Sequence, residues 1–245
     1  LKPQASPMEL SEAHHTLALY HQHYNRTDDA IAELKKSLDI YPENTSARLH
    51  LIEQYLLNNR LKDAETLISM TTQSELQDDL VRLNALLKLR QSKPRLAAEL
   101  IHKHHKGREA PAETLVLLGH IQIELNAFNM AEKSFSNALK IEPNLAQTSL
   151  VADLDMVRAI EGRADALRRL EGLLQEKENA INHWRLGLAL EHQGDLNSAV
   201  HHFSRAARLD TKGTFHFHFP PSVDLCRLEV NRKHYDKAEE YCMFA

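Results

Sequence analysis

Hydrophobic positions along residues 112–143 follow the spacing of two successive helices. The first run places four side chains on one helix face at three- and four-residue steps: Leu115, Leu118, Gln122 and Leu125. Residues 126–129 interrupt the pattern, and a second face follows with Ala131, Phe135, Ala138 and Ile141. Pro143 ends that run, because proline cannot continue a helix. The pattern therefore predicts a pair of antiparallel helices.

An alanine recurs along the chain at a nearly constant interval. It stands at Ala30, Ala64, Ala97 or Ala98, Ala131, Ala164 to Ala166, Ala199 and Ala238. The first five steps are 33 to 35 residues long, and the last is 39. Self-similarity at this period predicts a repeat protein, in which each unit contacts its neighbours and the array usually forms a binding surface.

The clearest unit resembles the tetratricopeptide repeat, whose signature runs Trp-x2-Leu-Gly-x2-Tyr, then Ala-x3-Phe, then Pro. The matching residues are Leu118, Gly119, Ala131, Phe135 and Pro143, and the departures are Leu115 for the tryptophan and Gln122 for the tyrosine. Small residues at 119 and 131 let two antiparallel helices approach closely. The same frame fits Leu17, Ala18, Ala30, Leu34 and Pro42; Leu51, Ile52, Tyr55, Ala64 and Ile68; Leu186, Gly187, Ala199, Phe203 and Ala206; and Leu225, Cys226, Ala238 and Cys242.

The resemblance implies an all-α fold, an α-solenoid built as a right-handed superhelix of antiparallel helix pairs. We expect a linker over residues 1–10 and one solenoid over 11–245. The expected repeats are roughly 11–44, 45–77, 78–111, 112–145, 146–179, 180–213 and 219–245, with an insertion near 211–221. The third and fifth are degenerate. Because the last pair has no successor in this sequence, we expect a further mate downstream or self-association through it.

Composition agrees with a helical binding protein and excludes several other classes. The chain has 245 residues, of which 42% are hydrophobic and 26% charged, and its net charge of −4 gives no nucleic-acid signature. Glycine is scarce, with 7 residues, and aromatic residues make up 6%, which argues against an all-β protein. No apolar run approaches the roughly 20 residues that span a bilayer.

The family resemblance also locates a groove, because the first helix of each pair lines the concave face. Transferring that frame gives these groove residues: His15, Leu19 and His23; Leu49, Glu53 and Leu56; Val116, His120 and Ile123; Trp184, Leu188 and His192. Some family members clamp a partner's C-terminal carboxylate with lysine and asparagine at such positions. His15, Leu19, Leu49 and Glu53 replace those residues here, so this clamp is not expected. A partly apolar groove favours a peptide held through side-chain pockets.

Trp184 leaves two alternatives open. It is the only tryptophan, and tryptophan is enriched among interface anchors, which favours exposure in the groove. It also lies one residue from the family's usual tryptophan position, which favours packing between repeats.

Two further surfaces are candidates for partner contact. A basic patch contains Lys88, Arg90, Lys93, Arg95, Lys103, Lys106 and Arg108, which either attracts an anionic partner or is the solvated face of a degenerate repeat. In the insertion, residues 215–219 alternate phenylalanine and histidine with the period of a strand. These phenylalanines either cover the sixth helix pair or contact a partner.

Sixteen histidines and two cysteines are the remaining candidate chemistry. His14 with His21, His102 with His105, and His216 with His218 can each pair by spacing, but no spacing supplies a third ligand, so we predict no metal and no cofactor. Cys226 and Cys242 fall on facing helices of the last pair. They are either bridged, which favours an oxidising compartment such as a bacterial periplasm over the cytoplasm, or two buried free thiols.

No phosphate loop, nucleophile elbow or paired catalytic carboxylates occur, so we expect a protein that is not an enzyme. The expected function is a non-catalytic interaction scaffold for a protein or peptide partner. The alternatives are the recruitment domain of a larger enzyme and an assembly factor of a bacterial envelope complex.

Overall fold

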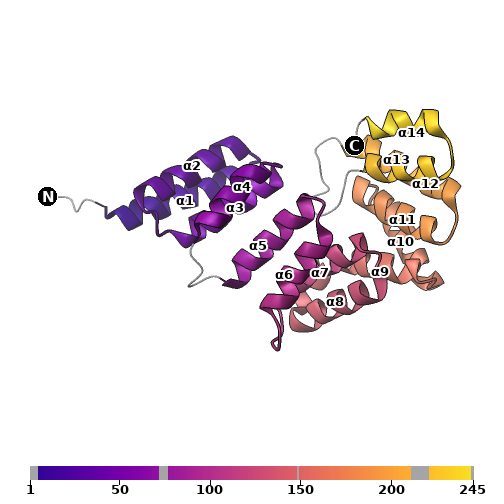
Figure 1. The fold of residues 1–245 in the computed structure, drawn as a ribbon, viewed down its shortest axis with the longest axis horizontal. Helices are drawn as coiled ribbons and strands as arrows, with labels where there is room; N and C mark the ends of the chain where they lie inside the picture. The colour runs from indigo at the N-terminus through magenta and orange to yellow at the C-terminus, as the bar shows by residue number, and fades with distance from the viewer. Residues whose placement is uncertain (1–4, 72–76, 148, 211–220, 244–245) are drawn as a thin grey trace. The chain divides into compact units, whose positions relative to one another are not determined.

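The computed structural model describes residues 5–71, 77–147, 149–210 and 221–243, and over these residues every regular element is a helix (Figure 1). Fourteen α-helices and one short 3-10 helix, η1 (Pro143–Gln147), follow one another in the described residues. The all-α, α-solenoid fold class predicted from the sequence is confirmed. The alternating segment 215–219 lies outside the described residues.

The chain forms two compact units, Leu1–Lys106 and Gly107–Ala245. The first contains three helix pairs: α1 (Pro7–His23) with α2 (Thr27–Ile40), α3 (Thr45–Leu57) with α4 (Leu61–Met70), and α5 (Gln77–Arg90) with α6 (Pro94–His104). Helix α1 begins inside the range expected as a linker, because Ser6 and Glu9 form a capping box around Pro7.

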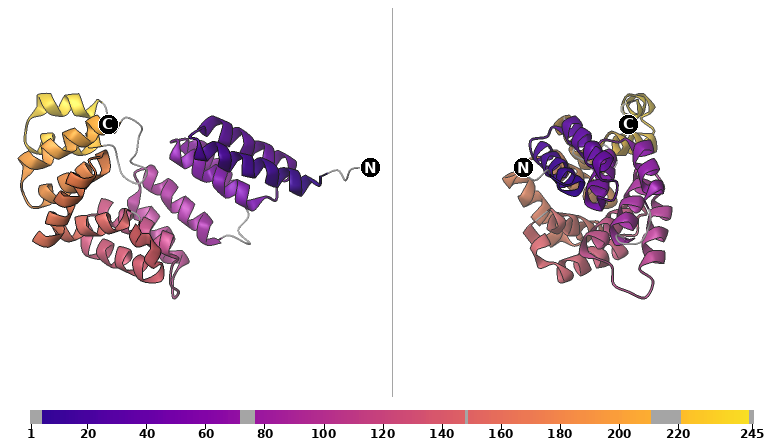
Figure 2. Two further views of the ribbon diagram at one scale, coloured as in Figure 1. Left: turned by 180° about the vertical axis from the view of Figure 1, so that it is seen from behind. Right: turned by 90° about the vertical axis from the view of Figure 1, so that its left-hand side faces the viewer.

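The second unit contains four helix pairs, seen from two further directions in Figure 2. They are α7 (Ala112–Glu124) with α8 (Phe128–Ile141), α9 (Leu150–Ile160) with α10 (Ala164–Glu176), α11 (Ala180–His192) with α12 (Leu196–Leu209), and α13 (Pro221–Asn231) with α14 (Tyr235–Cys242). Within this unit each pair packs on the next, and α9 also contacts α11.

The turn inside every helix pair contains one residue in the left-handed backbone region. These residues are Asn25, Asn59, Ser92, Asn126, Gly162, Gly194 and Lys233, with φ between 55° and 86°. A left-handed residue just after a helix lets the chain reverse while the last carbonyls keep hydrogen-bond partners. The turns therefore repeat with the same period as the alanines, and asparagine or glycine occupies five of the seven because those residues tolerate this conformation best.

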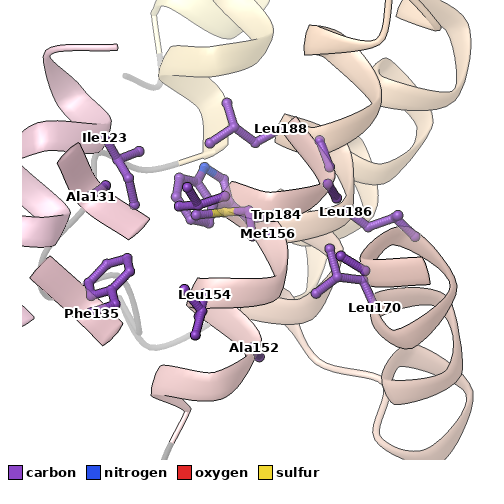
Figure 3. Packing of buried hydrophobic residues seen from close by; sticks show 14 of the residues in the cluster. Ile123, Ala131, Phe135, Ala152, Leu154, Met156, Leu170, Trp184, Leu186 and Leu188 are labelled. Carbon is purple, nitrogen blue, oxygen red and sulfur yellow. The ribbon is translucent and has the colours of Figure 1, made fainter. Parts of the chain in front are cut away.

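Close approach of paired helices explains the recurring small residues. A Cβ atom placed on Gly119 would lie 2.2 Å from Cε1 of Phe135, and one on Gly187 would lie 2.9 Å from Cδ1 of Phe203. Both phenylalanines are fully buried, as are Ala131 and its counterparts at the other helix contacts. In each of these pairs the ring therefore occupies the space that glycine leaves open. Figure 3 shows how the second unit's core continues from Phe135 past Leu154 and Met156 to Trp184.

Candidate functional site

A cavity of about 320 Å³ lies in the second unit, between the first helices α7, α11 and α13. We call it the Trp184 pocket. Its lining is Ile123, Glu124, Asn126, Phe128, Trp184, Leu188, Glu191, His192, Val223, Asp224 and Arg227. The structure thus brings four of the six groove residues predicted for this unit to one cavity, from helices about 60 residues apart in the sequence.

Trp184 forms the inner wall of this pocket. Its side chain packs in the same core cluster as Ile123 and Leu188, and Figure 3 shows it lying between those two residues. Only 3% of the residue is exposed, and its indole Nε1 donates a hydrogen bond of 2.8 Å to Oδ2 of Asp224 on α13. Both alternatives left open by the sequence therefore hold in part, because Trp184 packs between repeats and also lines a cavity.

Arg227 joins α13 to α11 at the pocket wall. Its guanidinium donates to both carboxylate oxygens of Glu191, at 2.5 and 2.8 Å, and to Oδ1 of Asp224 at 3.0 Å. These charge-assisted bonds raise the pKa of Arg227 further above its usual range, so it stays charged. One cation is shared between two carboxylates.

A third carboxyl group of the lining belongs to Glu124. Burial raises the pKa of Glu124 to about 7, and attraction to His120 and Arg227 offsets only part of that effect. Burial also raises the pKa of Asp224, although Trp184 and Arg227 both donate hydrogen bonds to it. Both shifts have the same cause: the loss of hydration raises the pKa of each carboxyl more than the neighbouring donors and positive charges lower it.

The rim of the pocket is aromatic. The ring of Phe128, at the start of α8, meets the imidazole of His192 edge to face, with centroids 4.7 Å apart. Loss of hydration lowers the pKa of His192, so this ring is neutral at pH 7.

The other two predicted groove residues of this unit lie away from the pocket. Val116 is half-buried and packs against the core. His120 is buried, with its ring 5.2 Å from that of Phe135 and its Nε2 3.9 Å from Oδ2 of Asp153 on α9. His120 therefore lies among core residues between two helix pairs.

The predicted groove residues of the first unit differ widely in exposure. Leu19 and His23 are exposed, Leu49 and Glu53 are half-buried, and Leu56 is fully buried. His15 is buried, and its Nε2 lies 2.6 Å from Nδ1 of His50, so one proton is shared between the two rings. Burial is the main reason that the pKa of His50 is lowered.

The predicted basic patch is only partly available as positive charge. Lys88 is bonded to Glu65 at 2.9 Å, and burial lowers the pKa of Arg90. The exposed members are Lys93, Arg95, Lys103, Lys106 and Arg108, of which the first four belong to the first unit and the last to the second.

Within the described residues, one group of side chains has the geometry for metal binding. Asp78, His104 and His105 of the first unit place three potential ligand atoms within 4.8 Å of one another. Spacing alone pairs His102 with His105, whereas the fold selects His104 and adds a carboxylate from another helix. Nε2 of His104 lies 2.6 Å from Oδ1 of Asp78, a contact that links the end of α6 to the start of α5.

Cys226 and Cys242 form a disulfide between α13 and α14, with their Cα atoms 5.0 Å apart. Cys226 precedes Arg227 in the sequence, so this bridge adjoins the wall of the Trp184 pocket.

A larger cavity of about 730 Å³ lies in the same unit, between α9, α10 and α11. Both arginines of its lining are bonded to carboxylates. Arg169 donates to both oxygens of Asp155, and Arg185 donates to Asp153 and Asn182. These two arginines are therefore already engaged within the protein.

Sequence reasoning missed most polar residues of the Trp184 pocket, but a signal for two lining residues was present. The step from Ala199 to Ala238 is 39 residues. Adding it to Trp184 and Leu188 gives Val223 and Arg227, which both line the pocket. Glu124 and Asp224 stand next to frame positions and carry no periodic signal of their own.

The helix pairs and the pocket between first helices define a helical-repeat binding fold, and the comparisons with known proteins identify the repeat. Family models of the tetratricopeptide repeat match residues 23–87, 112–145 and 158–213, together more than half of the chain. The chain belongs to the tetratricopeptide repeat family, as its alanine period and Gly119 predict. This repeat is generally a non-catalytic protein-interaction fold. No curated protein matches the chain in sequence.

Solved structures of repeat proteins are similar to this chain. A chain of the APC/C hetero-tetramer Cut9-Hcn1 is similar with a TM-score of 0.63 and 16% identity. The match covers 89% of the present chain and 42% of the chain in that structure. PilW, a widely conserved type IV pilus biogenesis factor, has a TM-score of 0.60 at 16% identity, covering 89% and 99%. A tetratricopeptide repeat protein from Parabacteroides merdae has a TM-score of 0.55 at 14% identity, covering 94% and 90%. At these identities the likeness shows the fold alone. Over the described residues, no helix is long and apolar enough to cross a bilayer.

Proposed function

We propose that this protein is a non-catalytic scaffold that binds a peptide or protein partner along the groove formed by the first helices of its pairs. The observation that supports this most is the Trp184 pocket, where Ile123, Trp184 and Leu188 give an apolar wall beside a few polar groups. That combination is typical of sites that bind one side chain of a partner. The family's general role in protein interaction agrees with it.

Selection of peptides from a random library by the intact protein tests this proposal. Trp184 is the only tryptophan, so its fluorescence reports binding at the pocket directly. Val223→Phe places a larger side chain in the cavity from α13, and it should reduce the affinity for the selected peptides at least 10-fold. Val151→Phe is the matched control, because Val151 lines the larger cavity of about 730 Å³ in the same unit. Selected peptides that bind both variants as tightly as the original protein would place the binding surface elsewhere.

A second candidate is an assembly factor of a bacterial envelope complex. The observation that favours it is the disulfide between Cys226 and Cys242, because such bonds persist in oxidising compartments such as the periplasm. Fractionation of cells that express the full-length protein, with thiol trapping in each fraction, tests this candidate. Protein found reduced and only in the cytoplasm would exclude it.

A further inference from the structure

We propose that Asp78, His104 and His105 bind a divalent transition metal ion, with Zn²⁺ as the expected ion and one carboxylate and two imidazoles as its ligands. We call these three residues the α5–α6 cluster. The inference goes beyond the proposed function, because the cluster belongs to the first unit whereas the Trp184 pocket belongs to the second.

The antiparallel course of one helix pair assembles the α5–α6 cluster. Asp78 lies in the first turn of α5, His104 is the last residue of α6, and His105 caps that helix. Because the two helices run in opposite directions, the start of one lies beside the end of the other, and Nε2 of His104 comes within 2.6 Å of Oδ1 of Asp78. The carboxylate comes from 26 positions earlier in the chain, which is why the spacing of histidines supplied no third ligand.

The three side chains converge on one place. Each offers a ligand atom, and all three atoms lie within 4.8 Å of one another. The rings of His104 and His105 are nearly perpendicular, at 84°, with their centroids 4.8 Å apart, so they do not stack face to face. Ligand atoms of a tetrahedral Zn²⁺ site are roughly 3.4 Å apart, given bonds of about 2.0–2.2 Å. Small rotations of the side chains would therefore bring the three atoms to the spacing of a bound ion.

The set of donor atoms indicates the kind of ion. Two imidazoles with a carboxylate suit Zn²⁺ and its first-row neighbours, whereas Ca²⁺ and Mg²⁺ take oxygen ligands. Three protein ligands leave the fourth position of a tetrahedral ion to water. His105 is buried, with 8% of the residue exposed, while 38% of the Asp78 side chain is exposed. An ion would thus enter from the side of Asp78 and meet the imidazole of His105 deeper in the protein.

The proposal does not require these side chains to be free of other bonds. Metal-bound histidines and carboxylates commonly keep further hydrogen bonds, which orient them towards the ion. The contact between His104 and Asp78 holds two of the ligands together, and an ion would take the place of the proton between them. An ordinary ion pair at the helix ends is the alternative explanation of this contact, and it needs only two of the three residues.

Calorimetric titration of the intact, untagged protein with ZnCl₂, after dialysis against a chelator, tests the proposal. We expect one ion to bind per chain in the micromolar range or more tightly. His105→Gln and Asp78→Asn should each weaken binding at least about 10-fold. His102→Gln and Asp79→Asn are the matched controls and should leave the affinity unchanged, because His102 is exposed on the same helix and the carboxylate of Asp79 lies 3.6 Å from Arg82.

Asp78→Cys provides a second test, in which a signal is gained. A thiolate in place of the carboxylate keeps three ligands at the cluster. Co²⁺, used as a spectroscopic substitute for Zn²⁺, should then show a sulfur-to-cobalt charge-transfer band in the near ultraviolet. Asp79→Cys is the control, because it places the thiol one residue further along α5, and it should show no such band.

Each outcome decides the question. Loss of affinity in His105→Gln and Asp78→Asn, together with the cobalt band in Asp78→Cys, supports the inference. Equal binding by all variants would place the ion at other histidines, and no binding by the folded protein would leave an ion pair only; either result overturns the inference. If His105→Gln or Asp78→Asn fails to fold by circular dichroism, the presence or absence of the cobalt band in Asp78→Cys decides. The proposed function is tested separately, through Val223→Phe.

Discussion

The indole nitrogen of Trp184 donates a 2.8 Å hydrogen bond to Oδ2 of Asp224, across 40 positions of sequence. The bond joins α11 to α13 at the pocket wall, and it allows a buried indole and a partly buried carboxyl to satisfy each other. Trp184 is thus both a core residue and a wall of the cavity. Replacing it by alanine would chiefly measure stability, since removing a buried tryptophan costs about 3–5 kcal/mol.

Trp184→Phe tests the hydrogen bond while retaining an aromatic ring. We expect the free energy of unfolding to fall by about 1–3 kcal/mol, because Asp224 loses a donor in a partly buried site. Urea denaturation followed by circular dichroism measures it. The double variant with Asp224→Ala should lose less than the sum of the two single changes, because the two residues interact directly. Strict additivity would show that the bond contributes nothing to stability.

Gly119→Ala should destabilise the second unit. The new Cβ would overlap the ring of Phe135, at a cost of about 1–3 kcal/mol, which exceeds the gain of about 1 kcal/mol from helix propensity. Gly172→Ala is the matched control, because that glycine is also helical and has no neighbour within 4 Å of its added Cβ. It should raise stability slightly. Thermal denaturation compares the two, and Phe135→Leu should relieve part of the Gly119→Ala loss.

How far the sequence predicts this molecule can be judged from these same residues. The alanine period locates the helix contacts well, because a contact between paired helices accepts only small residues, as at Gly119 and Ala131. The alanine period specifies which helix faces the groove, but it does not specify how deeply each side chain is buried. Trp184 and Leu188 are buried and His192 is exposed, although all three occupy predicted groove positions.

The spacing of residues along the sequence does not predict which polar side chains meet when helices pack together. Asp224 meets Trp184 because α11 and α13 of neighbouring repeats pack together, and Asp78 meets His104 because the two helices of one pair, α5 and α6, lie side by side. Neither carboxylate occupies a signature position of the repeat. The fold is therefore predictable from a period of one residue type, whereas the polar contacts of the pocket require the three-dimensional arrangement.

The histidine pair His183–His202 should make stability depend on pH. Their Nδ1 atoms lie 2.9 Å apart, and burial, then repulsion from His183 and His201, lowers the pKa of His202 to about 4. The folded pKa is below the unfolded value of about 6.5, so the unfolded state binds more protons between these values. The stability contribution is present above pH 6.5 and is lost as the pH falls towards 4.

We expect the free energy of unfolding to drop by about 1 kcal/mol from this group between pH 7 and 5, after allowing for its partial exposure. His202→Gln should reduce the drop measured in urea, whereas His201→Gln, on the exposed side, should change it less. Glu124 acts in the opposite sense, because its folded pKa is raised and its contribution is lost as the pH rises through about 7. A drop that is identical in His202→Gln would exclude this pair as its source.

Reduction of the disulfide should destabilise the last helix pair and change the surroundings of Trp184 in the pocket. Cys226 and Cys242 are 16 residues apart, and a closed loop of that length contributes about 3 kcal/mol in the chain-entropy model. A reducing agent should therefore lower the thermal midpoint and shift the fluorescence of Trp184, since Asp224 lies on the same helix as Cys226. The variant Cys226→Ala/Cys242→Ala should have the thermal midpoint and fluorescence of the reduced protein, and adding the reducing agent should change neither. Two free thiols titrated under denaturing, non-reducing conditions would show that the bridge does not form.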